Sequence, residues 1–411
     1  MRRTAFVRPW IALALLGTGG GAGADEPRWV GTWSCSPQPA DDAQAAEVAG
    51  FRDTTLRQVV HVSIGGARLR VRFTNEFGRT PLALASVRIA RSAGGGAIDP
   101  ASERPVTFGG RDSVTVPGGA PVLSDPMDFD LPPLSDVAVT LYLERGPDTV
   151  TTHPGSRTTS YLQPGRAVSA RDLKDARRVD HWYFLGGIDV VSATAAALAV
   201  LGDSITDGRG STTNQNNRWP DELARRLHAR KGAAPVAVLN AGIGGNRLLR
   251  DGLGPNALAR LDRDVLALPG VAWLIVLEGI NDIGTRVGAR AKGETWATAD
   301  DVIAAYEQIV RRAHARGLRV YGGTIMPFEG CEAYFTADAE ADRQAINRWV
   351  RTSGVFDAVI DFDAATRDRD RPSRLSPSAD GGDHLHPGVE GHRILAGAVD
   401  LDLFGEPGTR P

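Results

Sequence analysis

The sequence predicts two successive regions of different fold class: an all-β sandwich, then an α/β region with a parallel sheet covered by helices on both faces. Before residue 195, apolar residues recur at every second position in short segments separated by Gly, Pro, Asn and Asp, which is typical of a β-sandwich. After it, apolar runs alternate with segments of helical periodicity, as in units of strand, helix and strand. A chain of 411 residues suits two domains better than one.

The first region contains several short segments in which β-branched or apolar residues alternate with polar ones. Turn signals such as Gly65-Gly66 and Pro117-Gly118-Gly119 separate these segments. No helix is predicted between residues 51 and 164. The predicted strands are 56–64, 67–74, 82–90, 113–116 and 136–143.

The second region begins with a continuous apolar run at 196–201, as a strand buried on both faces requires. The clearest helix is 298–316, where Val302, Tyr306, Ile309 and Ala313 recur at helical spacing. The other predicted strands are 236–239, 271–277, 320–325 and 358–362. The other predicted helices are 219–230, 256–268, 337–352 and 388–401.

Residues 1–24 have the pattern of a secretory signal peptide. Arg2, Arg3 and Arg8 form a positive start, an apolar stretch follows, and Ala22-Gly23-Ala24 forms a small-x-small cleavage site. The apolar stretch is too short to span a bilayer, and no other segment reaches that length. We therefore expect cleavage after Ala24, a secreted or periplasmic protein, and no integral membrane association. The mature chain would then divide into domains at 25–190 and 191–411.

Net charge bears on the partners of the protein, and its two cysteines bear on a disulfide. The formal net charge is -2 and 42% of residues are hydrophobic, so the surface has no strong field to attract nucleic acid. Two cysteines, Cys35 and Cys331, lie one in each predicted domain. In an oxidising compartment they would either join the two domains by a disulfide or remain as two buried thiols, and the sequence leaves both alternatives open.

Polar residues follow the predicted parallel strands, and ligands bind beyond the carboxyl ends of such strands. Ser204 follows the first strand in Gly202-Asp203-Ser204, a tight turn that would present its hydroxyl above the sheet. A glycine-rich stretch at 242–246 follows the second strand, and Asn281 follows the third. Taken singly, each of these segments also fits an ordinary turn or a helix cap.

Asp383 and His386 supply a carboxylate and an imidazole three residues apart, after the last strand. A single turn lets the carboxylate accept a hydrogen bond from the ring, which fixes the tautomer. The alternative for His384-x-His386 is metal ligation, but no matching Asp or His partners lie nearby, so no metal or cofactor is expected. His153 is assigned to a loop, and His392 to the packing face of the last helix.

Four segments resemble, in order, the marker blocks of SGNH (GDSL) hydrolases: Gly202-Asp203-Ser204, residues 242–246, Gly279-Ile280-Asn281-Asp282 and Asp383-His384-Leu385-His386-Pro387. The resemblance covers roughly residues 195 to 403 and implies a flavodoxin-like three-layer α/β/α domain. It also implies Ser204 as nucleophile, His386 as general base and Asp383 as its partner. The implied oxyanion hole consists of Ser204 N–H, Gly245 N–H (or Gly244 N–H) and the Asn281 amide.

The N-terminal half is similar to a jelly-roll-like β domain that precedes the catalytic domain in one bacterial SGNH subfamily, on the segments 29–33, 57–61 and 68–77. The resemblance implies a carboxylic ester hydrolase, and the signal-peptide pattern of residues 1–24 predicts that it is secreted. Because no amphipathic lid is visible, we expect short-chain, acetyl-type esters, among them glycan esters. The alternatives are a lysophospholipase or broad aryl esterase, and a glycan-binding protein with a vestigial hydrolase fold. We also expect loop 327–335 to line the pocket and 161–190 to cross between the domains.

Overall fold

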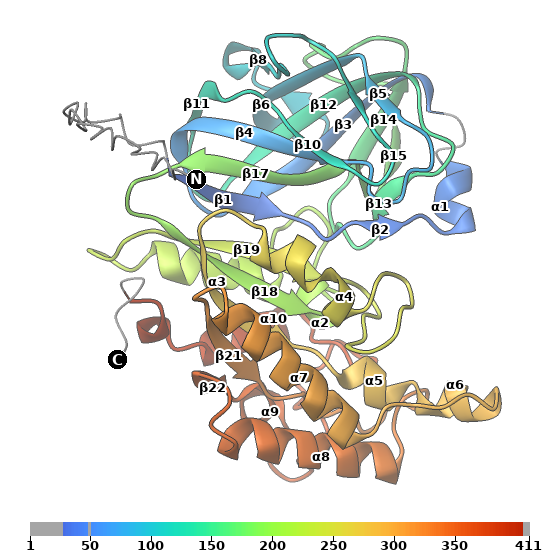
Figure 1. The fold of residues 1–411 in the computed structure, drawn as a ribbon, viewed down its shortest axis with the longest axis vertical. Coiled ribbons are helices and arrows are strands. Elements are labelled where there is room, and N and C mark those ends of the chain that lie inside the picture. The colour runs from blue at the N-terminus through green and yellow to red at the C-terminus, as the bar shows by residue number, and fades with distance from the viewer. Residues whose placement is uncertain (1–27, 48–50, 406–411) are drawn as a thin grey trace, which may run out of the picture.

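The computed structural model describes residues 28–47 and 51–405. Figure 1 shows two regions stacked along the long axis, an N-terminal β region (28–47 and 51–191) and an α/β region (196–405). The predicted signal peptide lies outside the described residues. Within the described part of the chain, no helix has the length and apolar character needed to cross a membrane.

Two large antiparallel sheets make up most of the N-terminal β region. The first sheet has the order β1 (Trp29–Ser34), β17 (Leu185–Val191), β4 (Gly66–Thr74) and β10 (Pro121–Leu123), with β11 (Met127–Leu131) also paired to β4. The second has the order β15 (Arg177–Val179), β14 (Ser160–Pro164), β3 (Arg52–Val62), β12 (Ser135–Arg145), β6 (Ser86–Gly94) and β7 (Ala97–Ile98), with β8 (Arg104–Pro105) on β6.

Apolar residues from both sheets form one buried cluster, which explains the alternation in the sequence. Leu56 of β3 and Val139 of β12 contribute from one sheet, and Val71 of β4 and Ile188 of β17 from the other. Each strand directs alternate side chains into this cluster and the rest away from it. Of the predicted all-β sandwich, an antiparallel β-rich region is therefore confirmed, and the finer assignments as a sandwich and as jelly-roll-like stay predictions.

Smaller elements complete the region. A three-stranded sheet has the order β16 (Trp182–Tyr183), β13 (Thr151–His153) and β2 (Gln38–Pro39), and β5 (Leu82–Leu84) pairs with β9 (Val114–Val116). The predicted strand 82–90 is thus two strands, β5 and β6. The two short helical segments are α1 (Asp42–Glu47) and a 3-10 turn at Pro100–Ser102.

The prediction that 161–190 crosses between the regions is wrong. This segment forms β14 to β17, and β17 lies between β1 and β4 in the middle of the first sheet. Leu185, Ile188 and Val190 are buried there, so the segment belongs to the β core. The crossing is made by the short stretch 192–195.

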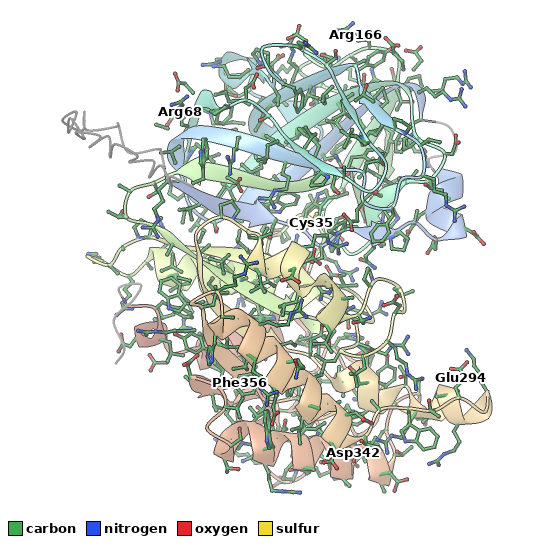
Figure 2. All side chains as sticks on the ribbon, viewed as in Figure 1. Cys35, Arg68, Arg166, Glu294, Asp342 and Phe356 are labelled. Carbon is green, nitrogen blue, oxygen red and sulfur yellow. The ribbon has the colours of Figure 1, made fainter. Side chains whose placement is uncertain are left out.

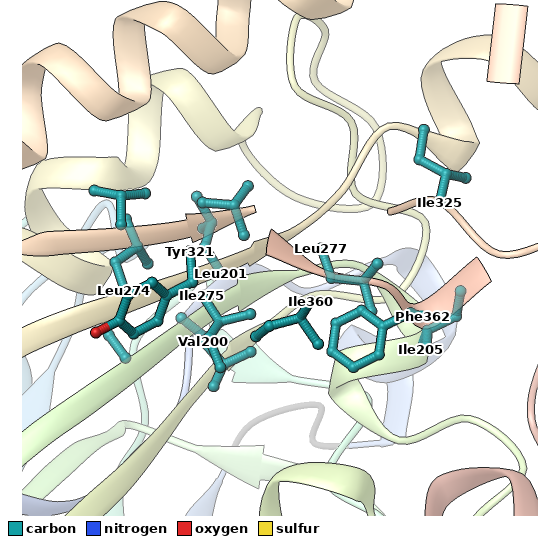
Figure 3. Close-up of a cluster of buried hydrophobic side chains, with 14 of the residues drawn as sticks. Val200, Leu201, Ile205, Leu274, Ile275, Leu277, Tyr321, Ile325, Ile360 and Phe362 are labelled. Carbon is teal, nitrogen blue, oxygen red and sulfur yellow. The ribbon is translucent and has the colours of Figure 1, made fainter. Parts of the chain in front are cut away.

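The α/β region is built on a parallel sheet of order β19-β18-β20-β21-β22, the doubly wound order of flavodoxin-like folds. Its strands are β18 (Ala196–Gly202), β19 (Val236–Gly242), β20 (Val271–Leu277), β21 (Arg319–Gly323) and β22 (Ala358–Ile360). Figure 3 shows the apolar cluster packed against this sheet, with Val200, Leu201 and Ile275 at its centre. The predicted parallel α/β fold is confirmed.

Helices pack in two groups against this sheet. α3 (Trp219–His228), α9 (Phe362–Thr366) and α10 (Val389–Ala398) form one contacting group, and α4 (Ala257–Leu261), α7 (Ala299–His314) and α8 (Ala337–Thr352) form the other. The predicted helix 256–268 is α4 followed by a π-helical segment, Asp262–Leu266. The short helices α2 (Ser204–Asp207), α5 (Ile280–Gly284) and α6 (Arg286–Ala291) were not predicted, because they are too short to show a period.

The two regions share a continuous apolar interface. Strand β1 packs along the edge strand β19, and Leu239 belongs to the same buried cluster as Val30. The Gly31 N–H donates to Pro269 O at 2.9 Å, and a Cβ at Gly31 would lie 2.9 Å from Leu239 Cδ1. Glycine at position 31 therefore permits this close approach.

Cys35 lies between the two regions (Figure 2). Both cysteines are free, so the disulfide alternative is wrong. The Cys35 thiol donates to Leu185 O at 3.2 Å, and burial raises its pKa far above the usual range. Cys331 is only partly buried, so the other alternative, two buried thiols, holds for Cys35 alone.

Candidate active site

Ser204 lies where β18 ends and α2 begins. The carboxylate of Asp203 caps this short helix by accepting the Ile205 N–H at 2.9 Å. Gly208 ends the helix with φ 107, and its N–H donates to Ser204 O. A four-residue helix capped at both ends fixes the hydroxyl above the carboxyl edge of the sheet, with Ser204 only 7% exposed.

The loop before α10 brings an imidazole and a carboxylate to this hydroxyl. His386 Nδ1 lies 2.7 Å from Asp383 Oδ2, and His386 Nε2 lies 2.9 Å from Ser204 Oγ. Because the carboxylate only accepts hydrogen bonds, Nδ1 carries the ring proton and Nε2 is free to accept from the serine. The structure thus brings Ser204, His386 and Asp383 together in that order.

Burial and charge set the protonation of this pair. Burial lowers the pKa of His386 below its ordinary 6.5, and the nearby charges of Arg209 and Arg157 lower it further, against the opposing effect of Asp383. Burial alone would raise the pKa of Asp383, but the hydrogen bonds that it accepts from His386 and Leu385 keep it below the usual range. At neutral pH the ring is therefore neutral and the carboxylate is ionised.

Two further polar groups predicted for the site lie beside Ser204. Gly245 and Asn281 line the same pocket as Ser204 and His386. The Asn281 amide donates one hydrogen bond to Asn246 O at 2.8 Å, which leaves its second N–H available. The alternative donor, Gly244 N–H, is already bonded to Asp207 Oδ2 at 3.1 Å, so the geometry favours Gly245.

Tyr334 orients Asn281 and was missed by the sequence analysis. Its hydroxyl donates to Asn281 Oδ1 at 2.7 Å, which determines which way the amide points. Tyr334 lies in loop 327–335 and lines the pocket, so the prediction for that loop is confirmed. No local motif marks this tyrosine, because its partner lies 53 positions away.

His153 is not the loop residue that the sequence suggested. It ends β13 and is only 3% exposed. Its Nε2 lies 2.9 Å from Asp207 Oδ1, and its Nδ1 lies 2.8 Å from Ser36 O. The N-terminal β region therefore contacts the short helix α2 that carries Ser204.

The pocket above Ser204 has a volume of about 490 Å³ and is lined by both regions. Gln38 and Arg157 line it from the N-terminal β region, and Gln38 also donates to Leu253 O at 2.9 Å. Leu253, 64% exposed, is the only large aliphatic residue among the described residues that line the pocket.

Comparison with known proteins matches one part of the chain to a family. Residues 200–394 match the model of the GDSL-like Lipase/Acylhydrolase family. The C-terminal half of the chain is a GDSL-like hydrolase domain. This domain follows the antiparallel β region. A comparison of the whole chain with curated protein sequences found no match.

Solved structures resemble the GDSL-like domain at low identity. A catalytic mutant of an acetylxylan esterase from Geobacillus stearothermophilus is 23% identical, with 52% of this chain and 96% of that chain covered and a TM-score of 0.40. The lipase/acylhydrolase from Enterococcus faecalis is 18% identical, with 52% and 99% covered and a TM-score of 0.39. An α/β-hydrolase enzyme from the metagenome of Lake Arreo is 20% identical, with 50% and 94% covered and a TM-score of 0.39.

A buried charged cluster underlies the site in the GDSL-like domain. The fully buried Arg260 donates to Gly202 O, Asn246 Oδ1 and Glu278 Oε1. Burial raises the pKa of Asp203 to about 7, and it also raises that of Glu278. Arg260 partly offsets this effect, and it ties the ends of β18 and β20 to the loop after β19.

Two further histidines near the site have structural partners. His384 is exposed and pairs with Asp380 at 2.5 Å, and the buried His392 accepts from Trp219 N–H at 3.2 Å. The prediction that His392 packs inward is confirmed. Among residues 28–47 and 51–405, no group of His, Cys, Asp or Glu has the arrangement of a metal site.

Proposed function

We propose that this protein is a serine esterase that hydrolyses short-chain carboxylic esters. The observation that carries the proposal is the chain of contacts from Asp383 through His386 to Ser204, at 2.7 and 2.9 Å. A hydroxyl bonded to a neutral imidazole whose other nitrogen faces a carboxylate is the arrangement that activates serine for acyl transfer. The family match over 200–394 supports the same class of reaction.

The proposed reaction has two steps. The Ser204 proton passes to His386 Nε2 as Oγ bonds to the ester carbonyl carbon. The tetrahedral intermediate then expels the alcohol, which takes the proton from His386, and leaves an acyl group on Ser204. Water repeats the sequence on the acyl-enzyme and releases the acid. Asp383 stabilises the imidazolium in both steps.

The oxyanion of each intermediate would be held by three donors. These are the N–H groups of Ser204 and Gly245 and the free N–H of the Asn281 amide. Removing one preorganised donor of this kind costs about a hundredfold or more in rate. The Tyr334 hydroxyl positions the amide through its bond to Asn281 Oδ1.

The pocket favours small acyl groups over lipid chains. Most of the described residues that line it are polar or glycine, and Leu253, at 64% exposure, is the only large aliphatic side chain among them. A long acyl chain would need an apolar channel to bury its methylenes. We therefore propose acetyl-type esters, including those of carbohydrates, and a lysophospholipase or aryl esterase is the alternative within enzymes.

The direct test is the hydrolysis of para-nitrophenyl esters from acetate to long chains by the wild type and by Ser204→Ala. We expect acetate to be the best substrate and Ser204→Ala to be inactive. Faster cleavage of long chains would favour the lipid alternative. Equal inactivity of both proteins on every ester would favour a glycan-binding protein with a vestigial site.

We also propose that the protein is exported after cleavage behind Ala24. The proposal rests on the charged, apolar and small-residue pattern of residues 1–24. N-terminal sequencing of protein from the culture medium or periplasm tests it. A start at Asp25 would support export, and an intact Met1 in the cytoplasm would contradict it.

A further inference from the structure

Two arginines and two aspartates line the pocket around Ser204, and they differ in how they are paired. The aspartates, Asp41 and Asp207, both have partners in the fold. Asp207 accepts from Gly244 N–H and faces His153 at 2.9 Å, and Asp41 accepts from Gln44 N–H at 2.8 Å. Both carboxylates therefore already have partners within the protein.

Arg157 has its backbone fixed, and its guanidinium has no salt-bridge partner in the described part of the chain. It lies between β13 and β14 with φ 49, a conformation that a non-glycine residue rarely adopts. Its carbonyl accepts from Asn214 N–H at 2.9 Å. Its Nε is buried without a hydrogen-bond partner among the described residues.

Arg209 enters the same pocket from the other region. It follows α2, its N–H donates to Ser204 O at 2.8 Å, and its carbonyl accepts from His392 Nε2 at 3.1 Å. Within residues 28–47 and 51–405, the guanidiniums of Arg209 and Arg157 form no salt bridge with any carboxylate. Two unpaired cations therefore share one pocket with His386.

The positive charges of Arg157 and Arg209 make protonation of His386 less favourable, and a bound anion would remove this effect. The two guanidiniums lie close enough to His386 to disfavour its protonated form, and that is the form it takes during acyl transfer. A negatively charged group between the arginines would offset this repulsion. The planar fork of arginine also matches a carboxylate or phosphate with two parallel hydrogen bonds.

We propose that the natural ester carries an oxyanion, a carboxylate or a phosphate, which Arg157 and Arg209 bind beside Ser204. The inference rests on the proposed esterase function and adds the charge of its substrate. One arginine comes from the N-terminal β region and one from the GDSL-like domain, so that both regions recognise the substrate. The N-terminal β region is then part of the binding site.

Matched acetyl esters test the proposal. The carboxylate probe is para-acetoxybenzoate, the phosphate probe is para-acetoxyphenyl phosphate, and the neutral reference is methyl para-acetoxybenzoate. The quantity measured is the ratio of kcat/KM for each anionic ester to kcat/KM for the neutral one. Comparing this ratio between proteins cancels differences in leaving-group reactivity.

The variants separate a local contact from a general charge effect. In Arg157→Gln with Arg209→Gln we expect the ratio to fall about tenfold or more, the size of a lost charge-assisted contact. Arg157→Lys with Arg209→Lys keeps the charges and should retain much of the preference. Arg166→Gln removes the same charge at the remote end of the N-terminal β region (Figure 2), and there the ratio should stay unchanged.

The outcomes distinguish this inference from the proposed function. If the anion preference of the wild type falls in the glutamine pair and not in Arg166→Gln, the inference is supported, and the probe with the larger fall identifies the oxyanion. If Ser204-dependent hydrolysis occurs with the same ratio in wild type and glutamine pair, the inference is overturned and the esterase remains. If no ester is cleaved in a Ser204-dependent way, both the anionic-substrate inference and the proposed esterase function are contradicted.

Discussion

The reactivity of the Ser204 hydroxyl depends on the protonation state of one imidazole ring, that of His386. Burial and the charges of Arg209 and Arg157 lower the pKa of that ring below 6.5. The neutral ring is the base, so activity should be lost only as the pH falls below this lowered pKa. The proposed esterase should therefore stay active in mildly acidic solution.

The first prediction concerns Arg209→Gln. Removing a positive charge near His386 makes its protonated form easier to reach, so the pKa rises and the acidic limb of kcat/KM moves to higher pH. The measurement is the pH profile with a neutral ester, and Arg166→Gln is the control for charge far from the site. An unchanged limb, or one moved to lower pH, would contradict this electrostatic explanation.

The second prediction concerns Tyr334. In Tyr334→Phe the Asn281 amide loses the hydrogen bond that orients it, so kcat should fall by up to about tenfold, the worth of one such bond. Asn281→Ala removes the donor itself and should cost about a hundredfold or more. Steady-state kinetics measure both, and the order of the two losses is the critical result. A larger loss in Tyr334→Phe would show that the tyrosine acts in another way.

Residues of the site differed in how far the sequence could predict them. Ser204, Asn281, Asp383 and His386 each stand in a short block after a strand, so pattern and resemblance located them. Tyr334 and His153 belong to no block, because they act through partners far away in the chain. Their roles depend on tertiary contacts that no local spacing encodes.

Among the elements, α2 is the one on which the site depends most. It has four residues and is held from outside, by Asp203 at its start and by the contact between His153 and Asp207 at its end. His153 also stacks on Trp182 with ring centroids 5.6 Å apart. Strand β13 of the N-terminal β region is thus a support for the helix that carries Ser204.

The third prediction is that His153→Ala lowers both stability and kcat. The carboxylate of Asp207, whose side chain is only 4% exposed, would keep the Gly244 N–H but lose its contact with the His153 ring, at a cost of about 1–3 kcal/mol. Asp207 would also hold the Gly244 N–H less firmly, and Gly244 precedes Gly245, the proposed oxyanion donor. Denaturant unfolding and kinetics measure the two effects.

His153→Gln is the matched control, because its amide can still donate to Asp207. It should recover part of the stability and part of kcat. Equal stability of His153→Ala and the wild type would show that the contact does not support α2.

Over the whole molecule, the two regions are held by an apolar interface along β1 and β19. Leu239 is fully buried in the cluster that also contains Val30 and Val190. Val238 N–H donates to Ser63 Oγ at 3.0 Å across the same boundary. The regions should therefore unfold together.

The fourth prediction tests that coupling with Leu239→Ala. The truncated side chain leaves a cavity between the regions and should cost about 2–5 kcal/mol. Val359→Ala, at a position 37% exposed on β22, should change stability by less than about 0.5 kcal/mol. Calorimetry should show one transition in the wild type, and two well-separated transitions would contradict a shared core.

The sequence predicted the two fold classes because each has its own apolar pattern. In the β region apolar residues recur at every second position, and in the parallel sheet each strand is a continuous apolar run. The sequence could not predict the interface between the two regions. The contact of Gly31 with Leu239 joins the two regions through residues far apart in the chain. The pairing of β17 with β1 does the same inside the β region. Only packing shows that 161–190 belongs to the β core.

The central claim is that His386 activates Ser204, and covalent labelling tests it most directly. A fluorophosphonate reacts with an activated serine and leaves a phosphonyl group on its oxygen. Mass spectrometry should find one adduct per chain, on Ser204, absent in Ser204→Ala and formed much more slowly in His386→Ala. An unlabelled wild type, an adduct on another residue, or equal rates in wild type and His386→Ala would contradict the claim.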